Sequence, residues 1–85
     1  MGYRVTIARE AAKAFRKIHS HDAARLKVAI LALTEDPRPF GSIRLSGGDG
    51  EMRIRVGSYR IVYDVHDDEL MILVLKIGHR REIYH

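Results

Sequence analysis

A β-hairpin is predicted by residues 52–63, which read Met-Arg-Ile-Arg-Val-Gly-Ser-Tyr-Arg-Ile-Val-Tyr. Apolar and polar side chains alternate with period two on both sides of Gly57-Ser58, which is typical of half-buried strands joined by a tight two-residue turn. With that turn, Arg55 is expected opposite Arg60, and Arg53 two residues along on the same face. The sequence therefore predicts a sheet with three arginines on one face and packing residues on the other.

Two interpretations of these arginines are compatible with the pattern. Like charges directly opposite each other destabilise a sheet by roughly 0.2 to 1 kcal/mol, so one interpretation is a solvated outer face on which the guanidinium groups spread into water. The other is an anion site, because forked and permanently charged donors suit a phosphate group. The alternation alone leaves both open.

The remaining chain predicts an α+β fold in the order β-α-α-β-β-β-β, with residues 1–85 forming a single domain. Two adjacent amphipathic helices are expected to form an antiparallel hairpin packed on one face of a mainly antiparallel twisted sheet. Ala8 is a poor N-cap for the first helix, whereas Ser20 or Asp22 can cap the second. The elements expected outside the hairpin are a strand at 3–7, helices at 10–18 and 23–34, a weak strand at 43–45 and a strand at 70–75.

The strand at 70–75 is almost continuously apolar, which is the pattern of a central strand covered on both faces. Two short helices cover only one face, so we expect Leu73 and Leu75 on the other face to form a docking surface. The glycine-rich segment 47–50 lacks the lysine and the spacing of a nucleotide-binding loop and is interpreted as a flexible turn.

Composition narrows the possible partners and sites. The formal charge of +4 favours an acidic partner such as nucleic acid. Cysteine is absent, which excludes disulfides and thiolate metal sites and fits a reducing, cytoplasmic location. The longest apolar run is too short to cross a membrane. His19 and His21 lack further ligands, so no metal site is expected, and the basic helix residues are expected to form a solvated face.

The hairpin, the acidic turn at 66–69, the apolar strand and the ending Gly78-His79-Arg80-Arg81-Glu82-Ile83-Tyr84 together resemble the RelE/ParE superfamily of toxins over essentially the whole chain. The resemblance implies a toxin of a bacterial or archaeal toxin-antitoxin system. RelE-like members cleave mRNA in the ribosomal A site, and ParE-like members poison DNA gyrase. It further implies no cofactor and no metal, the ribosome, mRNA and a cognate antitoxin protein as partners, and contact with operator DNA only through the antitoxin.

The resemblance also implies roles for individual residues. Arg60 matches the arginine that binds the scissile phosphate, Arg80 the arginine proposed as acid or charge stabiliser, and Tyr84 the tyrosine that orients or stacks on the substrate. Arg53 and Arg55 fall where RelE carries two lysines. Because arginine keeps its proton, they can hold phosphate but are poor bases, and His79 is the best nearby alternative. From the pattern alone, His79 also fits an ordinary turn histidine, and Tyr84 a core aromatic.

Three functions follow from these expectations. The leading one is a ribosome-dependent, metal-independent endoribonuclease that uses attack of the ribose 2′-oxygen on the adjacent phosphate. The second is a ParE-like gyrase inhibitor on the same scaffold. The third is a catalytically weak module that chiefly binds an antitoxin, an alternative kept open by the absence of lysine at Arg53 and Arg55.

Overall fold

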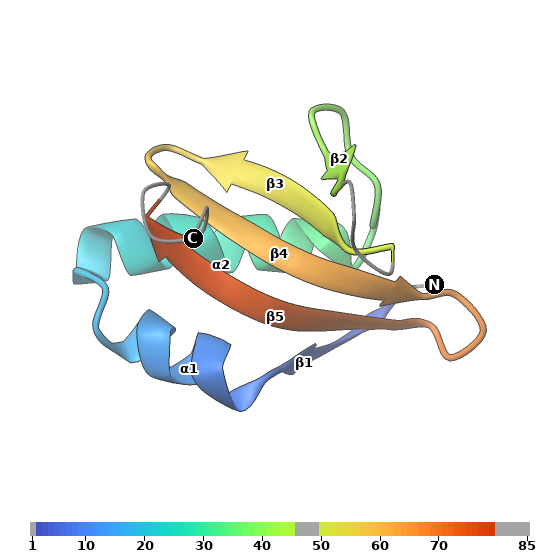
Figure 1. Cartoon of the computed structure of the whole chain (residues 1–85), viewed down its shortest axis with the longest axis horizontal. Helices are drawn as coiled ribbons and strands as arrows, with labels where there is room; N and C mark the ends of the chain where they lie inside the picture. Colours follow the sequence, from blue (N-terminus) through green and yellow to red (C-terminus); the bar gives the residue numbers. More distant parts are fainter. Residues whose placement is uncertain (1, 46–49, 80–85) are drawn as a thin grey trace.

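The computed structural model describes residues 2–45 and 50–79, and it confirms the predicted order of elements (Figure 1). Residues 47–49 of the turn predicted at 47–50 lie outside this range, as do the predicted site residues Arg80 and Tyr84. The helices are α1 and α2, and the strands are β1 to β5. Their bounds are β1 Arg4–Ile7, α1 Arg9–Arg16, α2 Ser20–Leu33, β2 Ile43–Arg44, β3 Met52–Val56, β4 Tyr59–His66 and β5 Met71–His79.

The five strands form one sheet in the order β1-β5-β4-β3-β2. β1 runs parallel to β5, and the other neighbouring pairs are antiparallel. Both helices lie on the same face of this sheet, as predicted, so the opposite face carries no helix (Figure 1). The middle position belongs to β4. The strand predicted at 70–75 is longer than expected and lies beside it, between β4 and β1.

The helix starts differ from the predicted ones in one informative way. Ala8 precedes α1 and provides no side-chain cap, as expected. The N-cap of α2 is His19 rather than Ser20 or Asp22, because the Nδ1 atom of His19 accepts a hydrogen bond from the backbone N–H of His21 at 3.2 Å. A ring nitrogen therefore replaces the hydroxyl or carboxylate oxygen that is usual at this position.

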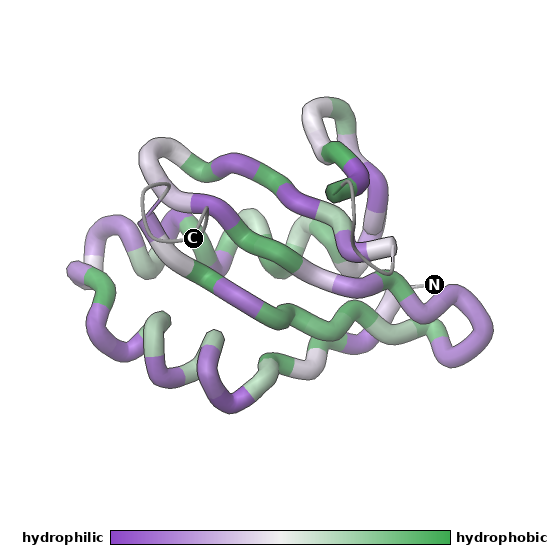
Figure 2. The backbone as a smooth tube through the Cα atoms, viewed as in Figure 1, coloured by the Kyte–Doolittle hydropathy of each residue, from purple (hydrophilic) through white to green (hydrophobic). Residues whose placement is uncertain are grey.

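The core lies between the sheet and the two helices. Its fully buried large side chains come from α2 and the two longest strands, β4 and β5, and they are Leu26, Leu33, Ile61, Tyr63, Ile72 and Val74. Figure 2 shows the matching pattern along the chain, with alternating hydropathy on β3 and a mostly hydrophobic β5. None of the described helices is long and apolar enough to cross a membrane.

A β-bulge in β5 changes which of its side chains face the helices. Val62 pairs with Lys76, but the next residue, Tyr63, pairs with Val74, so Leu75 is an extra residue in β5. A bulge places two residues opposite one and thereby reverses the alternation beyond it. Ile77 consequently joins the core, and Lys76 lies on the face without helices.

The two faces of β5 are not equally covered, as expected from two helices that pack on one side and leave Leu73 and Leu75 on the other. Ile72 and Val74 on the helix side are fully buried, whereas Leu73 and Leu75 are only partly buried. The cause is the fold itself, because both helices pack on the same side of the sheet.

Candidate functional site

Three arginines gather on the face of the sheet without helices, and we call them the arginine patch: Arg53, Arg55 and Arg60. The register confirms the predicted hairpin, because Val56 pairs with Tyr59 and Arg55 with Arg60. Ile54 and Ile61, which alternate with the arginines, belong to the core on the other side. The arginines of β3 and β4 are therefore on one face and close together, as the sequence predicts.

Two members of the arginine patch are buried, although they lie outside the core. Arg53 is 8% exposed and Arg60 6%, while Arg55 is exposed. Val62, which pairs with Arg53, is only 5% exposed and is not part of the core cluster under the helices. Long aliphatic stems commonly cover apolar surface in this way. The buried arginines argue against the interpretation of a freely solvated outer face.

Lys76 extends the arginine patch and was missed in the sequence. It pairs with Val62 on the side opposite Arg53, and it is exposed. Arg60 pairs with Gly78, which has no side chain. Lys76 and Arg60 are thus diagonal neighbours across β4 and β5, a separation that long side chains can span. The signal that could have revealed Lys76 is a single cation within an otherwise apolar strand.

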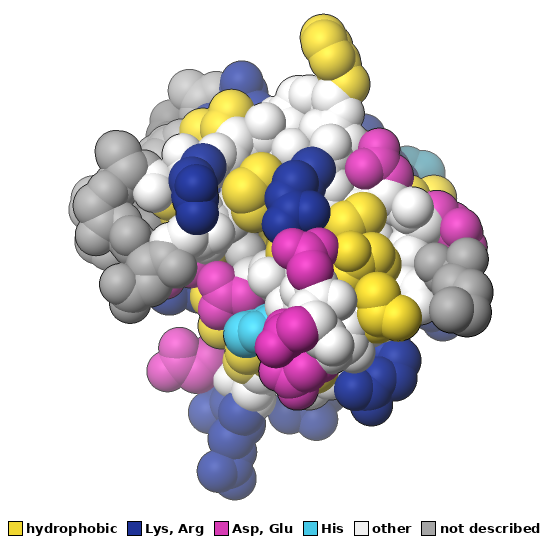
Figure 3. Space-filling model, turned by 90° about the vertical axis from the view of Figure 1, so that its right-hand side faces the viewer, with side chains coloured by type: hydrophobic (Ala, Val, Ile, Leu, Met, Phe, Trp, Pro, Cys, Tyr) yellow, Lys and Arg dark blue, Asp and Glu magenta, His cyan; other side chains and the backbone are white. Residues whose placement is uncertain are grey.

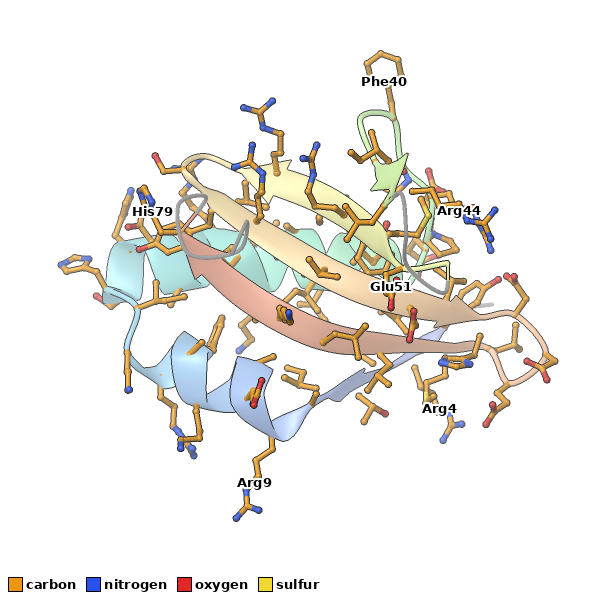
Figure 4. All side chains as sticks on the ribbon, viewed as in Figure 1. Arg4, Arg9, Phe40, Arg44, Glu51 and His79 are labelled. Atoms are coloured by element: carbon orange, nitrogen blue, oxygen red, sulfur yellow. The ribbon has the colours of Figure 1, made fainter. Side chains whose placement is uncertain are left out.

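Acidic side chains occupy the other end of the same face. Asp64 pairs with Leu73 on this face, and Figure 4 shows Glu51 on the side of the sheet away from the helices. Farther along, the turn between β4 and β5 carries Asp67, Asp68 and Glu69. Figure 3, which views this end, shows acidic side chains gathered there. Acidic side chains therefore lie near the β4–β5 turn together with Arg38 and Arg44, whereas the arginine patch lies near the β3–β4 turn and attracts an anion there.

A clamp of three side chains fixes the acidic end. Tyr3 donates a hydrogen bond from its hydroxyl to Asp67 at 2.6 Å, and Arg38 binds both carboxylate oxygens of Asp67, at 3.3 and 2.8 Å. Arg38 foremost, and Tyr3 next, lower the pKa of Asp67 from 3.8 to about 2. The hydrogen bond to Asp67 raises the pKa of Tyr3 in turn.

A second contact ties the connection between α2 and β2 to the sheet. The hydroxyl of Tyr63 donates to the carbonyl oxygen of Pro37 at 2.8 Å, and burial raises the pKa of this hydroxyl. This hydrogen bond and the Asp67 clamp together hold residues 37 and 38 against β4, the strand that carries Arg60 of the arginine patch.

His79 lies on the opposite face from the arginine patch. It pairs with Tyr59, next to the pair of Ile61 with Ile77, and both isoleucines belong to the core. Its ring meets that of Tyr59 edge-on, with ring centres 5.9 Å apart. The bulge at Leu75 is the reason, since unbroken alternation along β5 would have placed His79 on the open face. The arrangement therefore does not support His79 as the base for a linkage held by Arg60.

The described part of the site carries the kind of charge that suits a phosphate group. Arg53, Arg55 and Arg60 supply permanent positive charge, and Lys76 adds an amine on the same face. Among residues 2–45 and 50–79, no three histidine or acidic side chains are grouped as metal ligands.

Comparisons with known proteins agree with this geometry. Residues 5–84 match the sequence model of the ParE toxin of type II toxin-antitoxin systems. A Methanocaldococcus jannaschii protein that carries the name RelE1 is 30% identical, over 99% of this chain and 97% of that protein. The mRNA interferase toxin RelE of Escherichia coli is 29% identical, over 99% and 92%.

The fold is also similar to that of solved structures. The archaeal RelE in a RelE–RelB complex from Pyrococcus horikoshii has a TM-score of 0.82 to this chain and 30% sequence identity. The match covers 94% of this chain and 97% of that one.

Proposed function

Since the chain belongs to the ParE toxin family of type II toxin-antitoxin systems, we propose that it is an mRNA interferase, a toxin that cleaves mRNA as an endoribonuclease. The name of the Escherichia coli relative supports this choice. The single observation that carries it is the arginine patch, in which guanidinium-bearing side chains of β3 and β4 share one face. Such a patch suits one linkage of an RNA backbone.

The proposed reaction is an internal transfer at phosphorus. The ribose 2′-oxygen loses its proton to a base and attacks the adjacent phosphorus, while the bond to the 5′-oxygen breaks and that oxygen takes a proton from an acid. The products are a 2′,3′-cyclic phosphate and a 5′-hydroxyl. Arg53, Arg55 and Arg60 would stabilise the charge that develops on the phosphate oxygens. Arg80 and Tyr84 keep the roles that the resemblance implies, as acid or charge stabiliser and as the side chain that orients the substrate.

Lys76 is our candidate for the base. It lies on the face of the arginine patch and diagonal to Arg60, unlike His79. The amine of lysine can act as a base when neighbouring positive charge or desolvation favours its neutral form, whereas arginine keeps its proton. A titratable amine is thus present on this face although positions 53 and 55 carry arginine.

Ribosome dependence is the part of the proposal that a cleavage assay tests first. Purified protein is expected to cut mRNA on stalled ribosomes and to leave the same free RNA largely intact. Equal cutting of free and ribosome-bound RNA would contradict ribosome dependence. No cutting of either would select the third alternative, a module that chiefly binds its antitoxin.

Metal independence calls for a different assay, because ribosomes need Mg²⁺. We would place a phosphorothioate at the cleaved linkage and compare the rate in Mg²⁺ with the rate after adding Mn²⁺ or Cd²⁺, which bind sulfur better. The account expects no rescue by either thiophilic ion. A restored rate would indicate that a metal ion contacts the reacting phosphate.

The proposed partner in the cell is a protein antitoxin, because related structures are toxin-antitoxin complexes. An acidic antitoxin segment would neutralise the arginine patch and block access to RNA at the same time. The proposal predicts that antitoxin binding protects Arg55 from arginine-specific chemical modification, while Arg9 on α1 stays reactive. Protection of neither residue would contradict this mode of inhibition.

Gyrase inhibition is the second candidate, because the matching family model is named for ParE. It would not require the arginine patch as a catalytic site. Supercoiling by DNA gyrase in the presence of the protein separates the two, since an mRNA interferase leaves supercoiling unchanged.

A further inference from the structure

A cleft lies on the helix side of the sheet, between α1 and the ends of β4 and β5, and we call it the α1 cleft. Its cavity volume is about 610 Å³, a size usual for small-molecule sites. It lies behind the arginine patch, at the same end of the sheet but on the opposite face. The residues that matter for its chemistry are Lys13, Lys17, Ile18, Tyr59, Ile77 and His79.

The lining combines the groups that bind a nucleotide. Lys13 in α1 and Lys17 at its C-cap are both exposed and four residues apart, so both ammonium groups can reach one phosphate at the rim. Ile18 and Ile77 provide apolar surface. The rings of Tyr59 and His79 provide an aromatic face and edge, on which a base can stack. Glu10 also lines the cleft and repels a second phosphate at its own end, so the phosphate position lies toward Lys17.

A cation connects the α1 cleft to the arginine patch around the β3–β4 turn. The guanidinium of Arg25 on α2 lies against Gly57, since a Cβ atom there would be 3.2 Å from its Nη1 atom. Gly57 immediately follows β3, which carries Arg53 and Arg55, and is two residues before Tyr59, which lines the cleft. Positive charge therefore runs from one face of the sheet to the other at this end.

We propose that the α1 cleft holds a further nucleotide of the same single-stranded RNA whose linkage lies on the arginine patch. This inference rests on the proposed function, because it takes RNA as the substrate. The strand would pass around the β3–β4 turn, past Arg25, with one phosphate at Lys13 and Lys17 and one base against Tyr59 and His79. The cleft then contributes binding strength and not chemistry.

The test compares two double variants on the same helix. Lys13→Ala/Lys17→Ala removes two charges from the cleft, and Arg9→Ala/Arg16→Ala removes two exposed charges of α1 that do not line it. Figure 4 shows Arg9 pointing away from the sheet. The probe is a 2′-O-methyl RNA of about twelve nucleotides, which has no free 2′-hydroxyl to react and falls within the range covered by single-strand-binding surfaces.

Binding is measured by fluorescence anisotropy over a range of salt concentrations. The lysine variant is expected to bind the RNA on the order of tenfold more weakly, and the slope of log affinity against log salt is expected to decrease by about 0.7 for each lysine lost. The Arg9/Arg16 control keeps the wild-type affinity. A dinucleotide is short enough to reach only the arginine patch. The lysine variant and wild type are therefore expected to bind a dinucleotide equally well in a chemical-shift titration.

Three results would overturn the inference. The first is equal weakening by both double variants, which indicates a general charge effect. The second is wild-type affinity in the lysine variant. The third is His79 ring signals that do not move when the long RNA is added. If the wild-type protein cuts mRNA on ribosomes but any of these results is obtained, only the inference about the α1 cleft is contradicted. Absence of cleavage by wild type would contradict the proposed function itself.

Discussion

Lys76 is the residue whose environment most changes the expected chemistry. In the sequence it interrupts an apolar strand, and in the fold it is exposed beside Val62 on the face of the arginine patch. Its place on this face, diagonal to Arg60, is what makes it our candidate for the base.

Replacing Lys76 by methionine or by arginine distinguishes a base from a simple positive charge. Both variants are expected to lower the single-turnover rate of mRNA cleavage on ribosomes by about 100-fold or more, because neither side chain can take a proton. Lys27→Met, which changes an exposed lysine of α2, serves as the control and keeps the rate. A Lys76→Arg variant as active as wild type would show that charge alone is needed there.

Asp67 has a defined effect on the pH dependence of stability. Its pKa is lowered from 3.8 to about 2 in the folded protein, so the folded state prefers the ionised carboxylate. The corresponding stabilisation is fully present above pH 3.8 and is lost as the pH falls toward 2.

Removing the charge of Asp67 should therefore remove this part of the acid sensitivity. Chemical denaturation of Asp67→Asn at pH 6 and near pH 2.5 is expected to give a smaller drop in the free energy of unfolding than in wild type. Asp68→Asn in the same turn is the control, because among the described residues no hydrogen bond or ion pair is found for Asp68. An identical acid response of Asp67→Asn and wild type would contradict a stabilising role for the clamp.

At the scale of elements, the β3–β4 hairpin could be predicted completely and β5 only in part. Alternation around Gly57-Ser58 fixes which side chains share a face, and the observed pairs follow it. The bulge at Leu75 has no such signal, because its neighbours are all apolar and fit either face. The bulge reverses the faces of Lys76 and His79, which is why the sequence could not show that Lys76, and not His79, shares the face of the arginine patch.

The hairpin turn offers a prediction about this element. Gly57 has a φ of +60°, in the left-handed region that side chains disfavour, and Gly57→Ala is expected to destabilise the fold by about 1 to 2 kcal/mol. The guanidinium of Arg25 is close but can move, so backbone strain dominates. Ser58→Ala, without this strain, should change stability by less than about 0.5 kcal/mol in urea denaturation. Equal stability of the two variants would contradict this account of the turn.

At the scale of the whole molecule, acidic side chains are unevenly distributed along the sheet. The arginine patch, Arg25 and the lysines of the α1 cleft lie near the β3–β4 turn. Acidic side chains gather near the β4–β5 turn, beside Arg38 and Arg44 (Figure 3). The net charge of +4 follows from the sequence alone. Where the charged side chains lie on the molecule depends on how the strands pair, and only the fold shows this pairing. The residue pattern predicted the order of elements, which the structure confirms.

The central claim is that the arginine patch holds the RNA linkage that is cleaved. It is tested most directly by the cleavage rate of mRNA on stalled ribosomes for Arg55→Ala, Arg60→Met and Arg9→Ala, where methionine keeps an apolar stem beside Val62. The account predicts that the two patch variants cut at least about 100-fold more slowly than wild type while Arg9→Ala is unchanged. Cleavage by correctly folded Arg55→Ala and Arg60→Met at the wild-type rate would contradict it.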